Sequence, residues 1–111
     1  MYNIVWENDG MKNRVLCLPT SKHIEYVFSK ESIEGLRSTF DITFNDLERD
    51  YSSEEVADKI KGFDALITGW GSPPLTEAVF QSADRLRIIA HSAGSVKYML
   101  SRDVVQRYIL P

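Results

Sequence analysis

Two short glycine-containing segments of this sequence carry the residue types best suited to binding a small anion. Residues 69–71 read Gly-Trp-Gly, and residues 91–95 read His-Ser-Ala-Gly-Ser. Glycine lets the backbone approach a ligand closely, and successive exposed N–H groups can hold a carboxylate without a cationic side chain. Aromatic residues in loops are also enriched at binding sites. The candidate binding residues are Gly69, Trp70, Gly71, His91, Ser92, Ala93, Gly94 and Ser95.

Each of these residues also has a purely structural interpretation, and the pattern alone leaves both open. Gly94 can simply permit a tight turn, because short glycine motifs often occur by chance. Trp70 can line a pocket or fold over the adjacent helix as peripheral core. His91 can titrate in a cleft, but it has no acid–base partner by spacing and also fits a hydrogen-bonded structural role.

Both segments directly follow apolar runs that are typical of strands. We predict five strands in all, and residues 40–44 fit an edge strand because apolar and polar residues alternate there. Ligands of an open parallel sheet bind outside the carboxyl ends of the strands, so the two segments are predicted to share one edge. The predicted strands are residues 13–18, 40–44, 63–68, 86–90 and 108–110.

Helices are predicted between the strands from capping residues and apolar spacing. Ser52 with Glu55 three residues later forms a capping box, and Gly62 suits a left-handed helix end. The alternation of strands and helices predicts a parallel sheet covered by helices on both faces. The other predicted helix caps are Ser21, Ser32, Thr76 and Ser101.

Composition excludes several classes of function. The 111 residues suit one domain, and the net charge of −3 argues against a nucleic-acid partner. The single cysteine, Cys17, excludes an internal disulfide and a cysteine-rich zinc site. The sequence has no apolar run long enough for a membrane helix and no signal peptide, so we expect a cytoplasmic protein that binds no membrane. It also has no Gly-x-Gly-x-x-Gly fingerprint, P-loop, nucleophile elbow or metal-ligand cluster.

Three stretches of the sequence resemble a known family. Residues 64–67 (Asp-Ala-Leu-Ile), 73–76 (Pro-Pro-Leu-Thr) and 86–96 (Leu-Arg-Ile-Ile-Ala-His-Ser-Ala-Gly-Ser-Val) resemble the N-terminal substrate-binding domain of D-isomer-specific 2-hydroxyacid dehydrogenases. The similarity runs from about Val15 to about Leu110, and its distinctive part extends from about Gly62 to about Val96.

The resemblance implies a flavodoxin-like, three-layer α/β domain with a five-stranded parallel sheet. In the family, backbone amides corresponding to Ser92, Ala93, Gly94 and Ser95 hold the carboxylate of a small 2-oxo or 2-hydroxy acid, and residues 69–71 border its side chain. The chain departs from the family in having His91 where many members carry arginine, and in having residues 96–98 (Val-Lys-Tyr) where an acidic residue is usual.

The resemblance also implies that residues 1–111 are one domain of a longer enzyme. Family members bind NAD(H) in an inserted Rossmann domain and carry their catalytic arginine, glutamate and histidine in segments that have no counterpart here. We therefore expect this chain alone to bind no NAD(H) and to transfer no hydride, although the full-length protein would be an NAD-dependent oxidoreductase.

Two further expectations concern partners. Without the Rossmann domain and the helix that returns from it, apolar surface would be exposed, so a homo-oligomer is predicted, with strand exchange possible near residues 108–110. The alternative function is a stand-alone flavodoxin-like binding or signalling module without catalytic activity. A phosphoryl-accepting receiver domain fits poorly, because the run at residues 63–68 ends in Thr68 and Gly69 rather than in an acidic residue.

Overall fold

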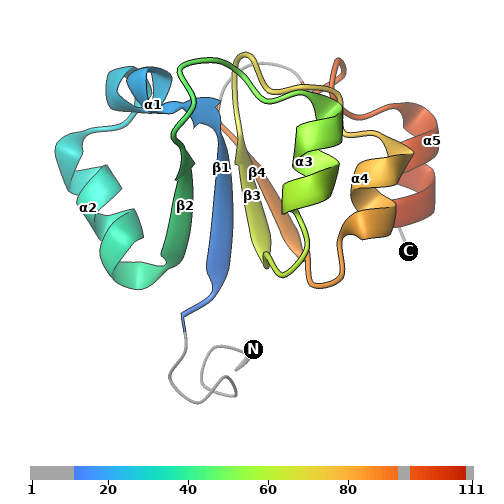
Figure 1. The fold of residues 1–111 in the computed structure, drawn as a ribbon, viewed down its shortest axis with the longest axis horizontal. Coiled ribbons are helices and arrows are strands. Elements are labelled where there is room, and N and C mark those ends of the chain that lie inside the picture. The colour runs from blue at the N-terminus through green and yellow to red at the C-terminus, as the bar shows by residue number, and fades with distance from the viewer. Residues whose placement is uncertain (1–11, 93–95, 110–111) are drawn as a thin grey trace.

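The fold is built on a parallel sheet of four strands. A computed structural model of the chain describes residues 12–92 and 96–109. Within them, the strand order is β2-β1-β3-β4, and every neighbouring pair is parallel. This order matches the first four positions of the doubly wound, flavodoxin-like order 2-1-3-4-5. The strands are β1 (Arg14–Thr20), β2 (Asp41–Asn45), β3 (Ala65–Thr68) and β4 (Ile88–His91) (Figure 1).

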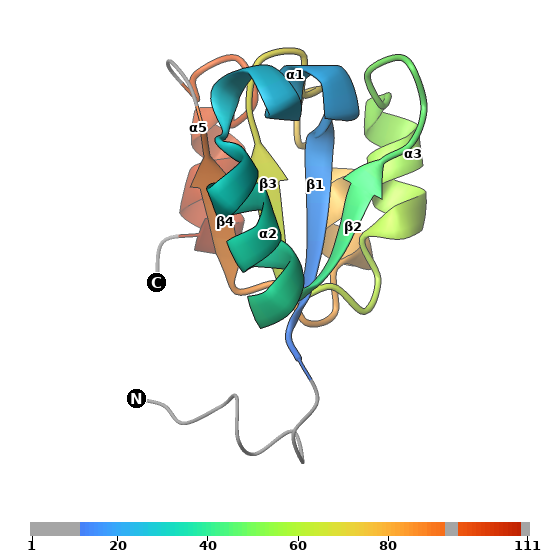
Figure 2. The same ribbon diagram turned by 90° about the vertical axis from the view of Figure 1, so that its left-hand side faces the viewer.

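Helices cover both faces of the sheet, as the sequence predicts. Two helices lie on one face, α1 (Ser21–Val27) and α2 (Lys30–Thr39), and Figure 2 views the sheet from their side. The other face carries α3 (Ser53–Lys59), α4 (Glu77–Ser82) and α5 (Arg102–Val104), the last of which continues into the π-helical turn η2 (Val105–Ile109). No helix in the described part of the chain is long and apolar enough to span a bilayer.

The predicted fifth strand at residues 108–110 is wrong. Tyr108 and Ile109 belong to η2, and Leu110 lies outside the described residues. The physical reason is the spacing of the apolar side chains, because Val104 and Tyr108 are four residues apart and share one helical face. Val104 is buried, and the Tyr108 ring stacks on Phe80 of α4 at a centroid distance of 5.2 Å.

The core forms two clusters, one on each face of the sheet, because strand side chains alternate. Leu16 of β1 and Leu66 of β3 are paired in register and belong to the cluster under α3 and α4. Cys17 and Ile67 are also paired and belong to the cluster under α1 and α2. Burial raises the pKa of the Cys17 thiol to about 12, so this cysteine behaves as a small core residue.

The residues that cap the helices can be compared with the predicted caps. The Ser52–Glu55 capping box is present, and Ser101 caps α5 by accepting a hydrogen bond from the Val104 N–H. The other two serine predictions are wrong by short shifts, because an earlier hydroxyl satisfies the first free N–H groups of each helix. Thr20 rather than Ser21 caps α1, and Ser29 rather than Ser32 caps α2.

Strand β4 is less covered than the rest of the sheet. It is an edge strand, and the side chain of Ile88 is 61% exposed. On the face that carries α2, a groove of about 530 Å³ separates that helix from β4, and Leu36, Ile67 and Ala90 contribute to its walls. An apolar edge strand with unpaired backbone groups is a template for another strand.

We expect the predicted self-association to occur through β4. Replacing Ile88 by lysine should weaken association about tenfold or more, because losing a buried isoleucine costs roughly 1.5–3 kcal/mol. Sedimentation velocity over a concentration series measures this effect. Tyr26→Lys is the matched control, because Tyr26 is 84% exposed but lies on α1, away from the edge. An Ile88→Lys variant that associates like the wild type would contradict the expectation.

Candidate ligand-binding site at the carboxyl edge of the sheet

The ends of β3 and β4 are joined through the main chain of Thr68. Both the backbone N–H and the side-chain hydroxyl of Ser92 donate hydrogen bonds to the Thr68 carbonyl oxygen, each at 2.8 Å. The Thr68 hydroxyl, which is fully buried, lies 2.9 Å from Nδ1 of His91. The segments that follow the two strands therefore begin side by side, as the sequence predicts.

Two glycines shape the loop after β3. At Gly69, a Cβ atom would collide with the Ser92 hydroxyl and approach Pro19 within 3.1 Å. At Gly71, the backbone has φ of +84°, and a Cβ atom would lie 2.5 Å from a carboxylate oxygen of Asp50. The loop is tied back on itself, because the Gly69 N–H donates to the Ser72 hydroxyl at 3.0 Å. Gly69 is thus required by close contacts, and Gly71 by its left-handed backbone conformation.

Trp70 projects from the loop between these glycines. Its side chain is 60% exposed, so it is not part of the peripheral core. The indole lies against the ring of His23 in α1, with 5.5 Å between the centroids. His23 is partly buried, and its Nε2 atom has no hydrogen-bond partner among the described residues. The helix after β1 therefore contributes a ring to this edge.

His91 and Tyr98 form a second aromatic contact at the same edge. Their ring centroids are 6.3 Å apart in an edge-on arrangement, and the Tyr98 hydroxyl donates to the Gly69 carbonyl oxygen at 2.7 Å. With Nδ1 of His91 at Thr68, the imidazole orientation is set by its neighbours. Burial first and the charge of Asp50 second raise the pKa of the Tyr98 hydroxyl, which is therefore a neutral hydrogen-bond donor at neutral pH.

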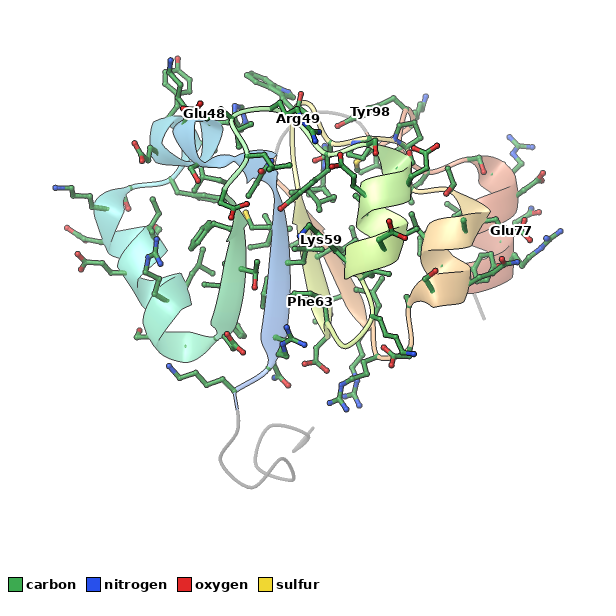
Figure 3. The ribbon with its side chains drawn as sticks, in the orientation of Figure 1. Glu48, Arg49, Lys59, Phe63, Glu77 and Tyr98 are labelled. Carbon is green, nitrogen blue, oxygen red and sulfur yellow. The ribbon has the colours of Figure 1, made fainter. Side chains whose placement is uncertain are left out.

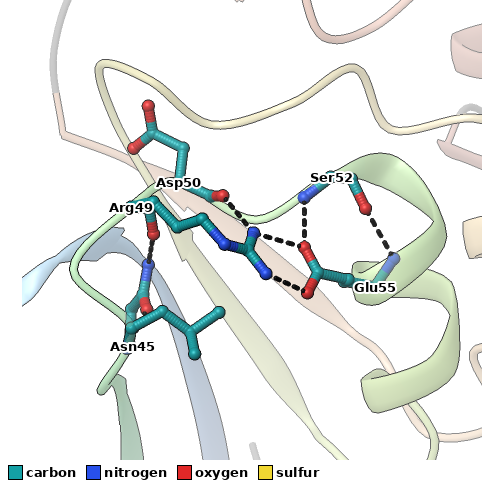
Figure 4. Close-up of polar contacts among 6 residues, drawn as sticks. Asn45, Arg49, Asp50, Ser52 and Glu55 are labelled. Carbon is teal, nitrogen blue, oxygen red and sulfur yellow. Dashed lines mark hydrogen bonds and ion pairs between the residues drawn. The ribbon is translucent and has the colours of Figure 1, made fainter.

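The loop between β2 and α3 is held by a network of polar contacts (Figure 4). The buried Asn45 amide donates to the carbonyl oxygens of Leu18 and Arg49, each at 3.0 Å. The Arg49 guanidinium binds both carboxylate oxygens of Glu55 at 2.8 Å and also donates to the Asp50 carbonyl oxygen at 3.0 Å. Bonds from Arg49 first and from the Ser52 N–H second lower the pKa of Glu55 to about 2. The network fixes the backbone from which the Asp50 side chain extends.

The structure brings together five of the eight predicted site residues. Gly69, Trp70, Gly71, His91 and Ser92 meet at the carboxyl edge, whereas Ala93, Gly94 and Ser95 lie outside the described residues. Sequence reasoning missed four contributors to this edge, which lie far from the glycine segments in sequence or outside their motif. They are Pro19, His23, Asp50 and Tyr98.

The chemistry of the glycine loop fits some ligands better than others. Among residues 12–92 and 96–109, no three His, Cys, Asp or Glu residues are grouped as metal ligands. The loop at residues 69–71 does not fit a dinucleotide phosphate, because the Gly69 N–H is taken by Ser72 and the Asp50 carboxylate lies against Gly71. Residues 69–71 therefore disfavour a negatively charged group.

Comparisons with known proteins agree with the fold. No protein-family model matches the chain, and no curated protein matches its sequence. One solved structure has a similar fold, with a TM-score of 0.59 and 17% sequence identity. It is an NAD-binding protein from Polaromonas sp. JS6 66 that is provisionally described as a D-isomer specific 2-hydroxyacid dehydrogenase. The match covers 86% of this chain but 27% of that chain. At this identity the likeness shows the fold alone, and this chain spans about a quarter of the length of the protein it resembles.

Substitution of Gly71 tests the strain at the candidate site. Gly71→Ala should destabilise the chain by roughly 1–2 kcal/mol, because alanine is strained in the left-handed backbone conformation, φ +84°, that this position adopts. Gly35→Ala is the matched control, because Gly35 lies within α2 with no atom within 4 Å of its Cβ position. The control should stabilise the chain by about 0.5–1 kcal/mol. Urea unfolding measures both values, and equal effects would contradict the geometry.

Acid should weaken the network around Glu55. Because the folded-state pKa of Glu55 lies below its ordinary 4.5, its stabilising effect is complete above that pH and is lost as pH falls toward 2. The difference in unfolding free energy between the wild type and Glu55→Gln should therefore shrink from about pH 5 to about pH 3. Glu54→Gln, one residue earlier in the same helical turn, should show a smaller change. A Glu55→Gln difference that is independent of pH would refute the pairing.

Proposed function

We propose that this chain is the substrate-binding domain of an NAD-dependent D-2-hydroxyacid dehydrogenase. The ligand would be a small 2-oxo or 2-hydroxy carboxylic acid at the carboxyl edge of the sheet. The observation that carries the proposal is the direct contact between the ends of β3 and β4, where the two glycine-containing segments begin and Ser92 donates two hydrogen bonds to the Thr68 carbonyl oxygen. Ligands of open α/β sheets bind at this edge.

The proposed roles divide the ligand into two parts. The backbone N–H groups of Ala93, Gly94 and Ser95 would hold the carboxylate, since successive amides in a loop form an anion-binding concavity. The N–H of Ser92, which the resemblance also assigns to the carboxylate, donates instead to the Thr68 carbonyl oxygen. The ligand's side chain would then extend along residues 69–71, where the exposed Trp70 ring offers an apolar wall. This division fits the described geometry, in which Gly69 touches Ser92 while Gly71 lies beside a carboxylate.

The cofactor would be bound elsewhere in the full-length protein. NAD(H) supplies or accepts the hydride in such a reaction, and the present glycine loop does not fit its phosphates. On this proposal, the acid–base groups and the dinucleotide site belong to other segments of a cytoplasmic enzyme. The isolated chain binds the acid and positions it, but it does not complete the reaction.

A titration followed by amide NMR tests the proposal. Adding pyruvate or D-lactate should shift the amide signals of residues 69–71 and 92–96, whereas adding NADH should leave them unchanged. Acetate serves as the control for nonspecific carboxylate binding, and its effect should be weaker at residues 69–71. Shifts with NADH alone, or no shifts with either acid, would contradict the proposal and favour a stand-alone binding or signalling module.

A further inference from the structure

A groove of about 430 Å³ runs beside β4, on the face of the sheet that carries α4 and η2. Its walls are mainly apolar and come from three parts of the chain. They include Phe80 of α4, Leu86 and Ile89 at β4, and Tyr108 of η2. Pockets that bind small molecules are concave and lined mostly by apolar and aromatic side chains. The size and lining of this groove therefore suit a small apolar ligand.

The wall formed by α4 and η2 is held in place by two contacts. The ring of Phe80 stacks on Tyr108 at a centroid distance of 5.2 Å. The Arg107 guanidinium donates hydrogen bonds to both carboxylate oxygens of Glu77, each at 3.0 Å. Figure 3 labels Glu77 on α4, the helix that this pair joins to η2. Because the Glu77 carboxylate is paired outside the lining of the groove, it does not neutralise a cation inside it.

The ionisable side chains that line the groove leave it without negative charge. They are Arg87, His91 and Tyr108, and no aspartate or glutamate of the described chain is among the lining residues. The Arg87 guanidinium has no hydrogen-bond or ion-pair partner in the described chain, whereas the neighbouring Arg85 is paired with Asp64 at 3.2 Å. A guanidinium is always charged and can hold a carboxylate through two parallel hydrogen bonds. The groove thus offers an unpaired cation to an anionic ligand.

The length of the groove along β4 sets the size of the ligand. Arg87 precedes β4 and continues its pairing, because the Arg87 N–H donates to the Asp64 carbonyl oxygen at 2.8 Å. His91 lies four residues further along, or about 13 Å at a rise of about 3.3 Å per residue, and Ile89 lies between them on the same face. A zigzag of carbon–carbon bonds of about 1.5 Å each reaches this length at about ten carbons.

We propose that this groove binds an unbranched fatty acid of about ten carbons. The carboxylate is held by Arg87 at the start of β4, and the alkyl chain lies along Ile89 beside Phe80 and Tyr108. Burial of the chain supplies affinity, and the guanidinium selects an acid over an alcohol or an amine. This inference does not rest on the proposed function, because Arg87 lies at the opposite end of β4 from the candidate site.

Three eight-carbon ligands of different charge test the inference by amide NMR titration at neutral pH. Octanoate should shift the amide signals of residues 86–89, 100 and 105–109 and should bind roughly threefold to tenfold more tightly than 1-octanol or octylammonium. From hexanoate to octanoate to decanoate, affinity should rise by about fivefold to tenfold at each step, because each step buries two more methylene groups. Dodecanoate should gain little over decanoate, because its chain extends beyond the groove.

Three variants separate the role of the charge from that of the apolar walls. In Arg87→Gln, affinity for octanoate should fall by roughly threefold to tenfold, while affinity for 1-octanol changes less than about twofold. Arg102→Gln removes the same charge from an exposed position on α5 outside the lining, so both affinities should match those of the wild type. Ile109→Asp adds a carboxylate to the wall at a side chain that is 43% exposed, and it should weaken octanoate more than 1-octanol.

Several results would overturn the inference. Equal affinities for the acid, the alcohol and the amine, or unchanged octanoate binding in Arg87→Gln, would show an apolar surface without charge selection. Octanoate shifts confined to residues 69–71 and 92 would assign the acid to the candidate site instead. Signals of residues 105–109 that respond to protein concentration but not to octanoate would assign the groove to a second copy of the chain. The proposed function is tested separately, with short hydroxy acids at the other end of β4.

Discussion

The carbonyl oxygen of Thr68 organises the carboxyl edge of the sheet. It accepts two hydrogen bonds from Ser92, and this double contact draws the end of β4 onto the end of β3. The close approach leaves no room for a side chain at the next residue, Gly69, whose own carbonyl oxygen then accepts the Tyr98 hydroxyl. Two other segments of the chain, at Ser92 and at Tyr98, therefore contact two consecutive residues. In each hydrogen bond the acceptor is a main-chain carbonyl oxygen, so the backbone of Thr68 and Gly69 sets where the donors from Ser92 and Tyr98 lie.

The charged residues near this edge have two different roles. In the loop before α3, the Arg49–Glu55 pair and the buried Asn45 amide satisfy one another and backbone groups, so they stabilise the loop without facing the β3 segment. Asp50 differs because its carboxylate contacts the glycine segment. Polar groups that are satisfied within the protein are poor ligands, whereas a carboxylate at the border of a candidate site affects what can bind there. Adjacent residues in one loop thus have separate physical roles.

Local patterns predicted local structure well. The Ser52–Glu55 capping box, the left-handed Gly62 and the edge position of residues 40–44 depend on near neighbours and alternation, which are visible in the sequence. The fifth strand failed because a short apolar run is ambiguous, and contact with Phe80 favours the helix. Five of the eight predicted site residues lie together at one edge for a similar reason, since strand ends can be predicted from apolar runs. Tyr98 and Asp50 were missed because they reach the glycine segment from residues about twenty or more positions away.

The strand order has a consequence for how the chain is made. β1 lies between β2 and β3, and its pairing with β3 joins residues as far apart as Cys17 and Ile67. During synthesis, β1 leaves the ribosome before β3, so one side of β1 stays unpaired until β3 has emerged, and only then can Leu16 and Leu66 meet. Long-range parallel pairing of this kind is slow because loop closure precedes the favourable contacts. The most buried strand of the native domain is thus exposed longest in the nascent chain.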